Sequence, residues 1–379
     1  MHMRALQEGE TRLNHSDSSP HDLDSALMKV DATACESYRS HVPLMIAYAN
    51  QQIAKRTTLT DLLGACPINL IYNLHADHAH LIAAQLQIKS GSTLIATIIR
   101  EYELFLPYGI SLDFFLSDFA VWMEATNQYL EARSAAQINA VYQQLCDLHP
   151  QLMLQARSPQ TQPNIADDLR PYFTQYLQAL LKPDMAAAIR VTGEYVKNPQ
   201  QLAIWWEGII YPAMHEIGRL WADGEISVGQ EHLATAITQR VMAIYYPLIL
   251  DLPRQKGSIV VASSPGELHE IGSRMLSDML ELNGWDAYCT GANTPKESII
   301  ELLRQTGSRF LCISTTLAHS LPGVKLLITA VRNANISPTP KIIVGGQAYI
   351  SDPTTWRQVG ADHYALNAHD GVLQIDSLS

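Results

Sequence analysis

The chain has 379 residues, of which 47% are hydrophobic, and a formal net charge of −11. This length provides for two or three domains with substantial cores. The acidic balance includes no basic stripe or arm, which argues against nucleic acid as a direct partner. The N-terminus is polar and no apolar run reaches transmembrane length, so we expect a cytoplasmic protein without a signal peptide or membrane span.

The cysteines are scattered along the chain, and no two of them have C-x-x-C spacing. This pattern indicates neither a zinc site nor a disulfide framework, and it fits a reducing compartment. The five are Cys35, Cys66, Cys146, Cys289 and Cys312.

The N-terminal part is predicted to contain a tail, a domain and a linker. Residues 1–30 are polar and rich in Ser, Asp and His, which predicts a disordered tail. Residues 31–154 have helical patterns throughout, punctuated by Pro and Gly, and predict an all-helical N-terminal domain. The Pro-containing stretch 155–166 is the predicted linker into the next domain.

Histidines gather on one predicted helix of this domain. His75 and His78 share a face of that helix, with Asp77 and His80 beside them. A metal site there is conceivable, but a helix surface that is simply rich in histidine is the commoner case.

Residues 167–252 carry four helical patterns joined by short breaks, near 167–181, 184–197, 205–221 and 231–250. They predict a four-helix bundle. Trp221 stands near the end of one helix, and Glu231 and His232 open the next after nine intervening residues. An indole can form an apolar lid over a ligand and a carboxylate can accept hydrogen bonds from a diol. Trp221 as plain bundle core and Glu231 as an ordinary acidic first turn remain open.

Residues 256–379 alternate apolar runs with helical patterns. The runs lie at 258–263, 310–313 and 342–344, and the helical patterns lie near 268–283, 296–305 and 321–333. This alternation predicts a Rossmann-like, doubly wound parallel sheet. Ligands of such sheets bind outside the carboxyl ends of the strands.

Three motifs fall at those carboxyl ends. The loop after the first run contains His269, with Glu267 two residues before it and Gly272 three residues after it. Ser314 follows Gly272 after 41 residues (273–313), and the pair Gly345-Gly346 follows Leu317 after 27 residues (318–344). A histidine in such a loop can bind a flat metal macrocycle from below, while a carboxylate holds its other ring nitrogen.

The order and spacing of these motifs resemble the cobalamin-binding domain that holds its cofactor in the "base-off, His-on" form, over about residues 257–379. The resemblance implies that His269 is the lower ligand of the cobalt and that Glu267 is its partner, where most of the family has Asp. It also implies that Ser314 meets the displaced nucleotide tail and that the two glycines leave room for it. The implied cofactor-binding set is Glu267, His269, Gly272, Ser314, Leu317, Gly345 and Gly346.

The spacing of Trp221 and Glu231 is similar to that of the light-sensing adenosylcobalamin proteins of the CarH type. This resemblance implies that Trp221 covers the adenosyl group, that Glu231 bonds the ribose hydroxyls and that His232 lies close to the same pocket. One departure concerns the residue after Trp221, which is Ala222 here and His in the well-known members. That position therefore cannot supply an upper cobalt ligand after light breaks the cobalt–carbon bond, and water, His215 or His232 would have to serve.

The CarH-type repressors carry a basic winged-helix module ahead of the bundle, which this chain replaces with a longer, acidic helical region. That layout resembles the photocobilins, which hold biliverdin in the N-terminal domain beside cobalamin. The candidates for contacts with a bilin are Tyr72, His75, His78, Arg100, Tyr102 and Tyr108. The alternative for this domain is packing and oligomerisation without a ligand.

The expected fold is therefore mixed α and α/β: an all-helical N-terminal domain, a four-helix bundle and a Rossmann-like cobalamin-binding domain. The expected protein is a light-sensing signalling protein and not an enzyme, with adenosylcobalamin and biliverdin as cofactors. Photolysis would change its domain arrangement or a light-dependent homo-oligomer, with a separate effector protein downstream. Two alternatives remain, a corrinoid carrier of a methyltransferase system and a subunit of an adenosylcobalamin mutase.

Overall fold

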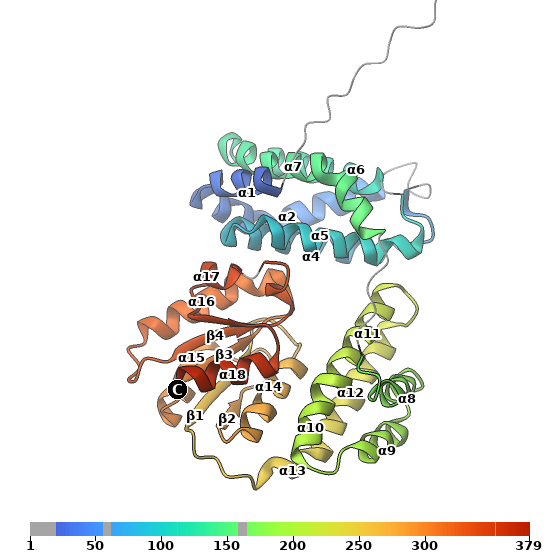
Figure 1. The fold of residues 1–379 in the computed structure, drawn as a ribbon. Coiled ribbons are helices and arrows are strands. Elements are labelled where there is room, and N and C mark those ends of the chain that lie inside the picture. Colours follow the sequence, from blue (N-terminus) through green and yellow to red (C-terminus); the bar gives the residue numbers. More distant parts are fainter. Residues whose placement is uncertain (1–19, 56–61, 112, 158–164, 353) are drawn as a thin grey trace, which may run out of the picture.

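The computed structural model describes residues 20–55, 62–111, 113–157, 165–352 and 354–379. Figure 1 shows three parts. An N-terminal helical domain lies across one end of the molecule, and below it a parallel sheet flanked by helices lies beside a helical bundle. The expected combination of a helical domain, a four-helix bundle and a Rossmann-like parallel sheet is confirmed. No described helix combines the length and the apolarity that crossing a membrane requires.

The N-terminal helical domain contains long helices that pack on one another. Asp31 and Ser90 cap two of them, because their side chains accept hydrogen bonds from the backbone N–H groups of Ala34 and Thr93. The elements are α1 (Pro20–Lys29), α2 (Ala32–Ala54), α4 (Ile68–Ile88), α5 (Gly91–Phe105), η1 (Leu106–Tyr108), α6 (Asp113–Tyr129) and α7 (Ala132–Ala156).

Within the predicted disordered tail of residues 1–30, residues 20–29 form helix α1 instead. This helix is polar in composition, but Leu23, Ala26 and Leu27 are apolar, lie at helical spacing and are all buried. Burial of this stripe against α5 and α7 supplies the stabilisation that the composition does not suggest. Residues 1–19 lie outside the described residues, as do residues 158–164 of the predicted linker.

The bundle begins with α8 (Arg170–Leu181) and α9 (Met185–Tyr195). The third helix is continuous but contains a π turn: α10 (Pro199–Trp205), η2 (Trp206–Ile210) and α11 (Tyr211–Ala222). The fourth is α12 (Val228–Tyr245), followed by the short α13 (Pro247–Leu250). A capping box of Ser227 and Gln230 starts α12, so this helix begins before Glu231.

The sheet domain has five parallel strands in the order β2-β1-β3-β4-β5. The strands are β1 (Ser258–Ser263), β2 (Asp286–Cys289), β3 (Phe310–Ser314), β4 (Lys341–Gly345) and β5 (His363–Ala365). The helices are α14 (Ile271–Leu282), α15 (Lys296–Thr306), η3 (Ala318–Ser320), α16 (Leu321–Asn333), η4 (Gln347–Tyr349), α17 (Thr355–Val359) and α18 (Ala368–Leu378). Strands β2 and β5 were not predicted, because both are short edge strands without a continuous apolar run.

The two faces of this sheet belong to two different cores. Successive residues of a strand point to opposite faces, so Val260 of β1 belongs to the core that is continuous with the N-terminal helical domain, and its neighbour Val261 belongs to the core that is continuous with the bundle. Strand β3 divides in the same way between Leu311 and Cys312. The sheet therefore contributes to two cores, one continuous with the N-terminal helical domain and one continuous with the bundle.

Candidate functional site

The predicted motifs meet at the carboxyl edge of the sheet. Ser263 at the end of β1 is in register with Ser314 of β3, which is in register with Gly345 of β4. In the strand order β2-β1-β3-β4-β5, the chain leaves β1 toward β2 on one side and leaves β3 toward β4 on the other. The loops after β1 and β3 therefore border the switch point of the sheet, where open α/β sheets bind ligands.

The centre of the site is a hydrogen-bonded pair. His269 Nδ1 lies 3.0 Å from Glu267 Oε1, and the Glu267 carboxylate is buried. The carboxylate also accepts hydrogen bonds from Ser264 Oγ at 2.5 Å, from the backbone N–H of Thr316 at 3.0 and 3.1 Å, and from the backbone N–H of Leu317 at 3.1 Å. The loop after β3 thus fixes the carboxylate, and the carboxylate fixes the imidazole ring.

These contacts set the protonation of both groups. Burial by itself raises the pKa of Glu267, but the hydrogen bonds from His269, Ser264 and Thr316 outweigh it and hold this pKa below its usual range. The hydrogen bond to Glu267 raises the pKa of His269 against the effect of burial, and the charge of Glu231 adds to the rise. Glu267 is therefore an anion that orients the ring and makes it a stronger base.

The free side of this ring fits a cobalt corrinoid. Nε2 of His269 has no hydrogen-bond partner in the described part of the chain, and its side chain is 56% exposed. Leu268 beside it is 80% exposed and Leu317 on the next loop is 37% exposed. An available imidazole nitrogen between uncovered leucines matches a metal held in a flat and largely apolar macrocycle.

The glycines of the motifs stand where the chain approaches itself closely. A Cβ on Gly272 would lie 3.3 Å from Ser314 Oγ, and one on Gly345 would lie 2.8 Å from the carbonyl oxygen of Ala365. Gly346 has a φ of +104°, and a Cβ there would overlap the backbone of Thr315. These contacts require glycine at 345 and 346 for the packing of the strand ends, before any ligand is considered.

The bundle presents its candidates near the end of α11 and the start of α12. Trp221 is 42% exposed, so it is not part of the bundle core. Glu231 Oε2 lies 2.6 Å from His232 Nδ1, and its Oε1 accepts a hydrogen bond from Thr235 at 3.0 Å. Gln239 of α12 donates a hydrogen bond of 3.0 Å to Glu270 Oε1, which joins this helix of the bundle to the residue after His269.

The candidates for a bilin do not converge on one site. His75, His78 and Tyr102 are buried inside the N-terminal helical domain, where they pair with Asp118, Glu101 and His149 at 3.0, 3.4 and 2.7 Å. The other three candidates are at least partly exposed: Tyr72, Arg100 and Tyr108. Within the described residues, no group of His, Cys, Asp or Glu side chains is arranged to hold a metal ion, so the cluster around His75 is not such a site.

Sequence reasoning missed some of the groups that hold Glu267. Two are backbone amides, of Thr316 and Leu317, which no side-chain motif can reveal. Ser264 stands three residues before Glu267, a spacing that could have suggested the hydrogen bond between them. His319 was also missed; burial lowers its pKa, and the charges of Asp77 and Glu267 act against this effect.

Two protein-family models match the chain and both describe a B12 binding domain, one over residues 257–373 and the other over residues 172–246. Dimethylamine corrinoid protein 3 of Methanosarcina acetivorans is 27% identical over 169 residues, which cover 44% of this chain and 77% of that protein. Dimethylamine corrinoid protein 2 of Methanosarcina mazei is 25% identical over 202 residues, which cover 52% of this chain and 91% of that protein. The solved structure of the Methanosarcina barkeri monomethylamine corrinoid protein is 19% identical, with a TM-score of 0.49, over 56% of this chain and all of that one.

These matches establish B12-binding domains and a corrinoid cofactor. They overturn the resemblance to CarH-type photoreceptors and photocobilins, because the relatives are methylamine corrinoid proteins. The light-sensing function and the light-dependent homo-oligomer are therefore wrong. The wrong prediction has a physical origin. A helical bundle beside a sheet with a His-on loop occurs in photoreceptors and in corrinoid carriers, and the spacing of Trp221 and Glu231 does not distinguish the two classes.

The predictions on enzymatic activity and on cofactors have separate outcomes. The expectation that the chain is not itself an enzyme is confirmed, because its relatives are corrinoid proteins. Neither adenosylcobalamin in particular nor biliverdin is supported by these matches.

Proposed function

We propose that this protein is a corrinoid carrier of a methyltransferase system, in which a separate methyltransferase is its partner. The observation that carries the proposal is the His269–Glu267 pair: Nδ1 is held at 3.0 Å by a buried carboxylate while Nε2 is free at the switch point of the sheet. The dimethylamine corrinoid proteins to which the last half of the chain is similar support the same class.

In this proposal His269 is the lower ligand of the cobalt, and Glu267 is its positioning residue. The carboxylate keeps the proton on Nδ1, so that Nε2 presents its lone pair away from the loop. A bound corrinoid supplies a metal centre that takes up and passes on a methyl group. Ser314 and Gly345 at the ends of β3 and β4, together with Gly346 and with Gly272 in the first turn of α14, would line the space for it.

On the other side of the corrinoid we assign Trp221 and Glu231. Trp221 has apolar surface uncovered near the end of α11, and it can exclude water from the face of a macrocycle. The carboxylate of Glu231 is held in place by His232 and Thr235, so it is available as a fixed acceptor for amide groups at the edge of the corrinoid ring. Neither role requires an adenosyl group.

Biliverdin is not part of this proposal. Three of its candidate residues, His75, His78 and Tyr102, are already bonded to other side chains in the core of the N-terminal helical domain.

The test is the binding of aquocobalamin to the full chain, followed by its absorption spectrum. We expect the wild-type protein to retain it in the His-on form, and His269→Ala to lose the spectrum of imidazole-bound cobalt. The matched control is His21→Ala, an exposed histidine of α1 that belongs to neither the sheet nor the bundle and should leave the spectrum unchanged. Failure of the wild-type protein to retain aquocobalamin would overturn the proposal.

A further inference from the structure

The family models begin at residue 172, so the N-terminal helical domain lies outside both matches. This domain is nevertheless in contact with the corrinoid loops. Helix α4 packs on η3 and α16, which directly follow the loop after β3, and α5 also reaches η3. The element that continues the Glu267-binding loop is therefore covered by N-terminal helices.

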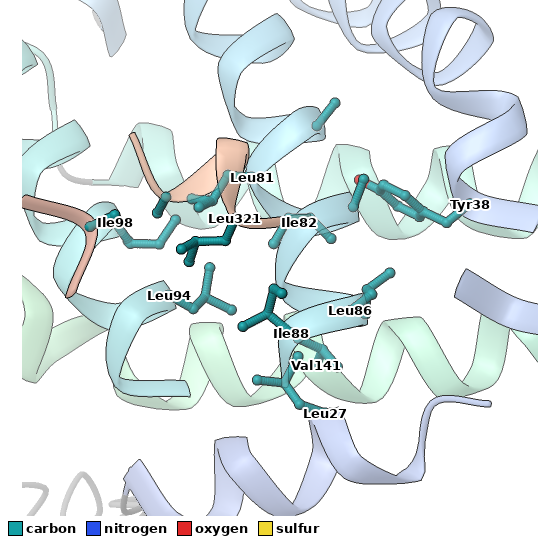
Figure 2. Packing of buried hydrophobic residues seen from close by; sticks show 14 of the residues in the cluster. Leu27, Tyr38, Leu81, Ile82, Leu86, Ile88, Leu94, Ile98, Val141 and Leu321 are labelled. Carbon is teal, nitrogen blue, oxygen red and sulfur yellow. The ribbon is translucent and has the colours of Figure 1, made fainter. Parts of the chain in front are cut away.

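The contact is a continuous apolar core. Figure 2 shows Leu321, at the junction of η3 and α16, among Leu81 of α4 and Leu94 and Ile98 of α5. All four side chains are buried. A packed core transmits displacements because it contains few voids that could absorb them. A change in the position of α4 or α5 therefore moves Leu321 and the turn before it.

Polar contacts fix the same domain to the sheet at a second place. Ser90 Oγ, at the start of α5, donates a hydrogen bond of 2.7 Å to Asp352 Oδ2, and Thr93 Oγ1 lies 3.4 Å from Thr355 Oγ1 of α17. These groups are buried or partly buried, so the N-terminal domain is held against the sheet domain and not merely tethered to it.

From η3 the path to the corrinoid ligand is short. Leu317 stands immediately before Ala318, the first residue of η3, and its N–H donates to Glu267 Oε1 at 3.1 Å. The same oxygen lies 3.0 Å from His269 Nδ1. Since hydrogen bonds weaken steeply as their geometry changes, the orientation of the His269 ring depends on where η3 lies.

We propose that the N-terminal helical domain positions the lower-ligand pair Glu267–His269 through the contact of Leu81, Leu94 and Ile98 with Leu321. The domain thereby acts on the corrinoid site through the loop after β3, and Leu81 is a positioning residue. This inference rests on the proposed function, because it presumes that the pair receives a corrinoid.

The experiment compares Leu81→Ala with Leu27→Ala in the full chain. Leu27 of α1 is an equally buried leucine of the same domain, and α1 packs on α5 and α7. Each variant is first shown by circular dichroism to be folded at the temperature used. The readouts are the dissociation constant for aquocobalamin and the fraction of bound cobalamin whose spectrum shows imidazole coordination.

We expect Leu81→Ala to weaken binding by about tenfold or more and to lower the His-on fraction, as loss of a group that orients a metal ligand does. Leu27→Ala should bind like the wild type, and Leu81→Met, which conserves volume, should restore most of the affinity. Ser90→Ala, which removes the N-cap of α5 together with the hydrogen bond to Asp352, should lower the His-on fraction in the same direction.

The inference is overturned if Leu81→Ala binds as tightly and as fully His-on as the wild type. It is equally overturned if Leu27→Ala produces the same loss, because the effect would then come from stability in general. A wild-type protein that does not bind aquocobalamin contradicts the proposed function itself, and this outcome is distinct from the other two.

Discussion

Trp206 of the bundle donates a hydrogen bond of 3.1 Å from its indole Nε1 to Asp278 Oδ2 on α14, and both side chains are buried. The pKa of Asp278 is raised to about 7; burial is the main cause and Glu281 contributes to the rise, while Trp206 and Arg274 act in the opposite direction. The contact between the bundle and the sheet domain therefore contains a carboxyl that keeps its proton to near neutrality.

The first prediction concerns Asp278→Asn. The folded protein holds the Asp278 proton up to about pH 7, whereas the unfolded chain loses it near its ordinary pKa of 3.8. The free energy of unfolding therefore falls as the pH rises from about 3.8 to about 7. Above about pH 7 the folded protein carries the full cost of the buried, ionised carboxylate. Asparagine keeps an oxygen for Trp206 but has no proton to lose, so we expect the variant to be more stable by about 1–3 kcal/mol at about pH 8.

Urea denaturation at about pH 5 and about pH 8 measures this difference. The gain should shrink toward the lower pH. Asp251→Asn, at an exposed carboxylate next to α13, is the control and should change neither value. Equal stability of Asp278→Asn and wild type at about pH 8 would contradict the prediction.

The second prediction concerns Glu267→Gln. Glutamine has the size of glutamate but only one accepting oxygen, and its NH₂ group would face the donors of Ser264, Thr316 or His269. We expect affinity for aquocobalamin to fall about 10–100-fold, and the free energy of unfolding to fall by about 1–3 kcal/mol. Spectral titration and urea denaturation measure the two effects. Glu297→Gln, at an exposed carboxylate of α15, should leave both unchanged; the prediction is wrong if Glu267→Gln behaves likewise.

The third prediction separates two costs of replacing a glycine. Gly346 and Gly307 both have positive φ, but a Cβ on Gly307 meets nothing within 4 Å, whereas one on Gly346 overlaps the backbone of Thr315. Gly307→Ala should therefore cost about 1 kcal/mol, for the left-handed conformation alone. Gly346→Ala should cost more than about 3 kcal/mol, because backbone atoms must move. Thermal denaturation of both variants provides the comparison, and similar costs would refute it.

The fourth prediction tests the upper face with Trp221→Ala. Since the indole is partly exposed, the free energy of unfolding should change by less than about 1 kcal/mol. If the indole packs on the corrinoid ring, affinity should fall by a similar factor for aquocobalamin and for adenosylcobalamin. Calorimetric titration with both cobalamins measures the two factors. A loss confined to adenosylcobalamin would instead assign Trp221 to the adenosyl group.

The sequence analysis predicted the parts of the site that depend on side-chain type and spacing. His269 and Glu267 are bonded to each other as the motif implies, and β1, β3 and β4 lie where the apolar runs are. The backbone donors of Thr316 and Leu317 could not be predicted, because any residue type provides an N–H group. The packing of Leu81 on Leu321 was also beyond reach, since periodicity identifies a buried face but not the domain that covers it.

The shared core around Leu321 also affects the order in which the chain can fold. During synthesis, α4 and α5 leave the ribosome more than two hundred residues before Leu321 does. Until then, Leu81, Leu94 and Ile98 lack their partner, and the N-terminal helical domain has an uncovered apolar face. Such a face is prone to aggregation until the sheet domain is complete.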